Sequence, residues 1–90
     1  MSLLKKLFGG GGGASEPEPV IYNNYRITPT PIQEGNDFRV SARVEKDFGE
    51  ETKVHTLIRA DTVSGLESAQ EVSIDKAKQV IDALGDRLFD

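Results

Sequence analysis

The chain has 90 residues, no cysteine, and 15 acidic against 11 basic side chains, which gives a formal net charge of −4. This length fits one domain, the lack of thiols excludes disulfides and thiolate metal sites, and the acidic balance argues against generic nucleic-acid binding. With no cleavable signal and no apolar run long enough to cross a bilayer, the sequence predicts a cytoplasmic protein.

Residues 1–19 are expected to form a flexible peptide and linker outside the folded body. On a helix, Met1–Phe8 would present one apolar face beside two lysines, and that face comprises Leu3, Leu4, Leu7 and Phe8. Two turns of helix are marginal in water, so this peptide would order only on a membrane surface, a partner or the domain itself. Gly9–Gly13 and the Glu-Pro-Glu-Pro run that follows are typical of a linker. A docking peptide and an unstructured start both fit the pattern.

The domain is expected to begin with a short apolar strand, Val20–Tyr22. A turn at Asn23-Asn24 follows, because asparagine tolerates the left-handed conformation. A second strand starts at Tyr25 and ends where Pro29 and Pro31 stop ladder pairing.

Asp37–Asp61 is the centre of the predicted fold and has the pattern of two long antiparallel strands. Its apolar positions alternate with polar ones on both arms, and they are Phe38, Val40, Ala42 and Val44, then Val54, Thr56, Ile58 and Ala60. Placing both rows on one face requires an odd loop length, and the three-residue loop 48–50 fits, with Gly49 supplying a positive φ. This register pairs Val44 with Val54.

One helix is predicted from about Gly65 to Leu84. Ser64 and Glu67 have the spacing of a capping box at its start, and Gly85 is placed to cap its end. The apolar stripe that would cover the sheet comprises Leu66, Ala69, Ile74, Ala77, Val80, Ile81, Leu84 and Leu88.

Leu88 and Phe89 are expected to fold back onto the core, because burial stabilises each by about 1.5–3 kcal/mol. The elements together predict an α+β domain over residues 20–90, an antiparallel three- to four-stranded meander sheet with one C-terminal helix packed on one face. A body this small is expected to be marginally stable or to self-associate as a homo-oligomer.

The sheet face opposite the helix is predicted to be basic. The register places Arg39 opposite Arg59, and Arg43 opposite His55, and like charges in these positions destabilise a sheet unless carboxylates or an anionic partner offset them. The candidate anion- or partner-binding residues are Arg26, Arg39, Arg43, Lys53, His55 and Arg59. Two interpretations stay open, a face that lies against DNA and a solvated face with local arginine–carboxylate pairs.

The sequence holds little that could perform chemistry. His55 is the only histidine, and no cysteine accompanies it in a metal site. The five consecutive glycines do not link a strand to a helix, as phosphate-binding loops do. We therefore expect no catalytic residue, no metal and no cofactor.

Four separated motifs occur together. They are Tyr-x-x-Tyr-x-Ile-x-Pro-x-Pro at 22–31, Phe-Arg-Val-x-x-Arg-Val-Glu-Lys at 38–46, His-x-x-Ile-Arg-Ala-Asp at 55–61, and Lys-Ala-Lys-Gln-x-Ile-Asp-x-x-Gly-Asp-Arg-Leu-Phe at 76–89. In this order and spacing the chain resembles the small bacterial HlyU family. The resemblance implies a non-enzymatic transcriptional activator associated with DNA or with a regulatory protein. The alternative is an adaptor that binds a protein or a membrane through Met1–Phe8.

Overall fold

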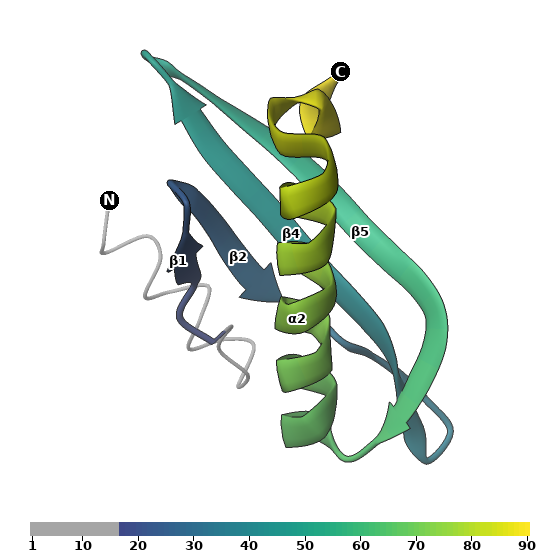
Figure 1. Ribbon diagram of the computed structural model, residues 1–90. Helices are drawn as coiled ribbons and strands as arrows, with labels where there is room; N and C mark the ends of the chain where they lie inside the picture. Colours follow the sequence, from purple (N-terminus) through teal and green to yellow (C-terminus); the bar gives the residue numbers. More distant parts are fainter. Residues whose placement is uncertain (1–16) are drawn as a thin grey trace.

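The computed structural model describes residues 17–90 and confirms the α+β class. In chain order the elements are β1 (Val20–Tyr22), β2 (Tyr25–Pro29), β3 (Ile32–Glu34), β4 (Asp37–Phe48), β5 (Glu51–Ser64), the helix α2 (Leu66–Leu84) and the 3-10 helix η1 (Gly85–Phe89). The strands form one antiparallel sheet, and α2 lies across one face of it (Figure 1).

β4 is the central strand of the sheet. β5 pairs with one edge of β4, whereas β2 and β3 pair one after the other with its opposite edge, and β1 pairs with β2. Pro29 ends β2, and Pro31 lies between β2 and β3. Because proline has no amide hydrogen to donate to a ladder, the run breaks into two strands, which gives the sheet its fifth member.

The two tight turns follow from residues that accept a positive φ. Asn23 and Asn24 have φ of 51° and 72°, and this pair of left-handed residues is the type I′ arrangement that joins twisted strands. Gly49 has φ of 69° and forms, with Glu50, the whole loop between β4 and β5. One left-handed glycine in first position is the type II′ arrangement, so the predicted three-residue loop is wrong.

The predicted register of the β4–β5 hairpin is therefore wrong by one residue. The two-residue loop pairs Val44 with His55, and Glu45 with Val54. Since neighbouring residues on a strand point to opposite faces, this slip turns over the whole first half of β5. Lys53, His55 and Leu57 lie on the helix side of the sheet, and Val54, Thr56 and Ile58 lie on the opposite side.

β5 bulges away from regular pairing near the middle of the sheet. Ser41 pairs with Ile58 and Arg39 pairs with Thr62, so residues 59–61 of β5 lie opposite Val40 alone. At this shift the backbone amide of Ser41 donates to Ser73 Oγ of α2 at 3.1 Å, and that hydroxyl donates to the carbonyl of Ala69 at 2.7 Å. A fully buried serine thus links the helix to the sheet where the ladder is irregular.

The helix α2 matches its predicted span but not its predicted cap. Gly65, with φ of 89°, is the N-cap residue, and no side chain caps the helix. The hydroxyl of Ser64 instead donates to Asp37 at 3.3 Å, so the capping box with Glu67 does not form. At the other end the amide of Gly85 donates to the carbonyl of Ile81, as predicted for a C-cap glycine.

The core lies between α2 and the strands β2 and β4. Its buried cluster consists of Tyr25, Ile27, Ala42, Val44, Ala77, Ile81 and Leu88. Phe89 packs against this cluster and stacks on Tyr25 with 6.2 Å between ring centroids. The chain end therefore folds back onto the core as predicted, through η1.

Candidate binding surface

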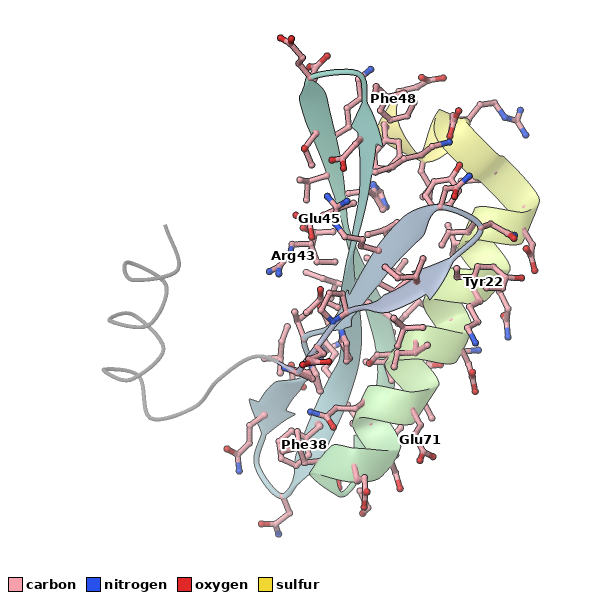
Figure 2. The ribbon with its side chains drawn as sticks, turned by 90° about the vertical axis from the view of Figure 1, so that its left-hand side faces the viewer. Tyr22, Phe38, Arg43, Glu45, Phe48 and Glu71 are labelled. Atoms are coloured by element: carbon pink, nitrogen blue, oxygen red, sulfur yellow. The ribbon has the colours of Figure 1, made fainter. Side chains whose placement is uncertain are left out.

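The face of the sheet turned away from α2, which we call the open face, carries three of the predicted arginines. Arg26 pairs across strands with Glu45, and Arg43 pairs with Thr28 and Thr56. Figure 2 shows Arg43 and Glu45 projecting from the side of the sheet opposite the helix. Arg39 shares this face by strand alternation.

The other three candidate residues lie elsewhere. Lys53 is opposite Lys46, and His55 is opposite buried Val44, so both lie on the helix side of the sheet. Arg59 belongs to the bulged segment of β5 and is not in register with a residue of β4, although its carbonyl accepts a hydrogen bond from Arg39 at 3.1 Å. The predicted pairs of Arg39 with Arg59 and of Arg43 with His55 do not form, because they depended on the wrong register.

Each arginine of the open face is paired with a carboxylate. Arg26 holds Asp47 through both terminal nitrogens, at 3.0 and 3.1 Å, and Arg39 holds both carboxylate oxygens of Glu34. Arg43 Nε lies 3.6 Å from Glu45.

Two of these pairs also shift the pKa values of their carboxyl groups. The guanidinium of Arg39 holds the pKa of Glu34 below its usual range, and that of Arg26, helped by Thr52, does the same for Asp47. Arg43 has its own carboxylate partner in Glu45 at 3.6 Å. The arginines of the open face are therefore neutralised by carboxylates, and the face is not a basic surface.

Aliphatic side chains stand exposed between these charge pairs. Register places them on the open face, and the exposed fractions are 66% for Ile21, 58% for Ile58, 50% for Val54 and 41% for Ile32. Val54 and Ile58 were predicted to lie on the helix side of the sheet, and this prediction is wrong. Gly49 in first position of a two-residue turn was the signal that would have placed them correctly.

A second polar cluster lies on the helix side, where η1 meets the hairpin. Asp86 accepts hydrogen bonds from the hydroxyl of Tyr25 at 2.5 Å and from Lys46 Nζ at 2.9 Å. Lys46 and Lys53 are directly opposite each other on β4 and β5, and both lie over the ring of Phe48, at 5.2 and 5.3 Å from its centroid. The aromatic ring and Asp86 offset the repulsion between these two positive charges. This cluster fixes η1 to the sheet.

The pH dependence of stability is expected to report on the Asp86 contact. The pKa of Asp86 lies below its ordinary 3.8, first because of the hydrogen bond from Tyr25 and then because of that from Lys46. A carboxyl group with a lowered pKa stabilises the folded state when the pH is above the ordinary pKa of the unfolded chain. This stabilisation is lost as the pH falls through the folded-state pKa. Asp86→Asn should therefore lower Tm at neutral pH, with the difference from wild type narrowing below about pH 4.

The control for this experiment is Asp75→Asn, on the exposed side of α2. It should leave Tm within a degree or two of wild type across the same pH range, in line with ordinary surface substitutions. A constant difference between Asp86→Asn and wild type from pH 7 to pH 2 would contradict the assignment of the stabilisation to the carboxylate charge.

The apolar residues of the N-terminal peptide, Leu3, Leu4, Leu7 and Phe8, lie outside the described residues, and their role in binding stays a prediction. Within residues 17–90 no three histidine, cysteine or acidic side chains come together in a way that could hold a metal ion. No helix in this part of the chain has the length and apolar character needed to span a bilayer.

A family model described as transcriptional activator HlyU matches residues 2–89 of the chain. The chain belongs to the HlyU family. Searches of curated proteins and of solved structures gave no match. The HlyU resemblance predicted from four motifs is thus confirmed, and the match extends beyond those motifs into the N-terminal segment.

The motifs that carry the HlyU resemblance have structural roles in this fold. The first supplies Tyr25 and Ile27 to the core and the two asparagines to the type I′ turn. The last supplies Gly85, Asp86 and Leu88, which end α2 and fix η1. Residues 17–90 contain a single α-helix, so a helix-turn-helix is not formed in this part of the HlyU chain. Any contact with a regulatory target by these residues must use another surface.

Proposed function

We propose that this HlyU-family protein regulates transcription without catalysis, by binding a protein partner in the cytoplasm through the open face of its sheet. The observation that carries the proposal is the mixture on that face of exposed aliphatic residues with arginines already paired to carboxylates. Protein interfaces combine an apolar centre with arginine and a polar surround. A partner could cover Val54 and Ile58 without the cost of desolvating a charged group that has no partner of opposite charge.

Direct DNA contact through the same face is the second candidate, favoured by the three arginines that share it. The carboxylates work against this candidate. A phosphate approaching Arg26 or Arg39 would also approach Asp47 or Glu34, and it would have to break an existing ion pair. The formal charge of −4 adds repulsion from the chain as a whole.

The test is genetic complementation with matched surface variants. In cells that lack the gene, wild-type protein should restore the affected transcripts, whereas Ile58→Asp should fail although the protein still folds. Leu66→Asp, at an aliphatic position on α2 that is 49% exposed, is the control and should complement fully. Full complementation by Ile58→Asp would contradict the role of the open face.

Fluorescence anisotropy with duplex DNA separates the two candidates. We expect no DNA binding stronger than micromolar at low salt, and the same result for Arg43→Ala. Tight binding that weakens steeply as salt rises and is lost in Arg43→Ala would instead support phosphate contact and overturn the protein-partner proposal.

A further inference from the structure

The outer edge of β5 is a long strand edge that no described element pairs with. β5 runs for 14 residues and pairs only with β4. Its regular part, residues 51–58, contains no proline and has a β-branched residue at every second position. Proteins usually shorten, bulge or cover such an edge, because its free amides and carbonyls recruit another strand. Here the bulge comes only after Ile58, so eight regular residues stay available.

We propose that this edge pairs with the β5 edge of a second copy of the chain, antiparallel and centred on His55. Because the two identical edges run antiparallel, the two-fold axis that relates them must be perpendicular to the sheet. The two sheets would then form one continuous sheet, with both copies of α2 on one side and both open faces on the other.

Charge complementarity selects the register. With His55 opposite itself, Glu51 lies opposite Arg59 of the second copy, and this attractive pair occurs twice by symmetry. On the open face, Thr52 meets Ile58, and Val54 meets Thr56, which are β-branched cross-strand pairs.

The two registers shifted toward the bulge are worse. Centring on Thr56 would place Lys53 opposite Arg59, and Glu51 opposite Asp61, which makes four repulsive pairs in the dimer. Centring on Leu57 would draw the bulged residues 59–61 into the ladder and place Arg59 opposite His55. The His55 register uses the regular residues 51–58 and reaches only the first bulged residue, Arg59.

Cysteine cross-linking tests this register on a background without thiols, because the chain has no cysteine. Directly opposed residues of an antiparallel pair have Cα atoms about 4.5–5.5 Å apart, within the range that a disulfide spans. His55→Cys should therefore give a disulfide-linked dimer in the full-length protein under mild oxidation. Leu57→Cys should not, because two such residues would lie about 13 Å apart along the strands. Preferential cross-linking of Leu57→Cys, or none of either variant, would overturn the proposal.

Charge reversal gives an independent test by sedimentation equilibrium. Glu51→Arg and Arg59→Glu should each weaken dimerisation by roughly tenfold, because each turns two attractive pairs into repulsive ones. The double variant restores opposite charges and should dimerise like wild type. A wild-type protein that stays monomeric at all concentrations, or single variants that dimerise like wild type, would rule the interface out.

Hydrogen exchange distinguishes this partner from other occupants of the edge. Amides on the outer edge of β5 should become protected as protein concentration rises, in step with dimer formation. Protection that does not depend on concentration but disappears when residues 1–16 are deleted would assign the edge to the chain's own N-terminal segment, and would overturn the second-copy proposal. Because the charged residues tested lie outside the open face, these results do not depend on the proposed regulatory role.

Discussion

Ile27→Ala is expected to lower the free energy of unfolding by about 2–5 kcal/mol. Ile27 is fully buried on β2, where it pairs with Val44 and belongs to the cluster that packs against α2. Truncation removes the free energy gained by burying the Ile27 side chain. It also leaves a cavity that the flanking strands β1 and β4 cannot close. A folded body of about 70 residues has a total stability of roughly 4–10 kcal/mol, so the loss is a large fraction of the whole.

Urea denaturation followed by circular dichroism measures this loss. The control is Ile21→Ala, the same chemical change on the neighbouring strand β1, where the side chain is 66% exposed on the open face. It should change stability by no more than about 0.5 kcal/mol. Equal losses for the two variants would mean that β2 does not face the core as described.

Leu88→Ala is the substitution with the second largest expected effect, again about 2–5 kcal/mol. Leu88 lies in η1, outside the helix, yet only 5% of it is exposed, and it belongs to the same cluster as Tyr25 and Ile81. If the chain end were merely attached to the surface, its truncation would cost little. The expected result is instead a loss comparable to that at Ile27.

Leu84→Ala provides the comparison for Leu88, since Leu84 ends α2 with 42% of its surface exposed. The loss of stability in Leu84→Ala should be well under half that in Leu88→Ala, because folding buries less apolar surface at Leu84. Thermal unfolding of both variants measures the difference. A Leu88→Ala protein that unfolds like wild type would contradict the packing of η1 against the core.

The features that local chemistry determines were predictable from the sequence. The α2 span, the C-cap at Gly85 and the left-handed turn at Asn23-Asn24 each depend on a few adjacent residues. The return of Leu88 and Phe89 followed from the free energy of burying them. The capping box failed because Ser64 remains in β5, where its hydroxyl reaches Asp37.

The register of β5 could not be predicted from alternation alone. Both sides of residues 53–58 carry apolar side chains, with Leu57 on one side and Val54 and Ile58 on the other. Either side could therefore face the helix. The two-residue turn at Gly49 decides between them. Lys53 of the helix side is accommodated by Phe48 and Asp86, which lie far apart in sequence.

The position of the arginines on the open face was predictable from the sequence, but their ion pairs were not. Arg26, Arg39 and Arg43 alternate correctly on their own strands, so their shared face followed from the sequence. Their neutralisation did not, because Arg26 reaches Asp47 across the sheet and Arg39 reaches back to Glu34 across a turn. Charge partners of this kind depend on strand order and side-chain direction together, which no spacing rule supplies.

The buried residues of α2 also determine how the helix crosses the sheet. Ala69, Ser73, Ala77 and Ile81 follow one another at intervals of four, and such a row winds at about 26° to the helix axis. When this row lies along the strands, the axis must run obliquely to them, as β4 and β5 do behind α2 in Figure 1. A one-residue insertion after Ser73 would rotate the rest of the helix by about 100°, so the oblique crossing could not survive it.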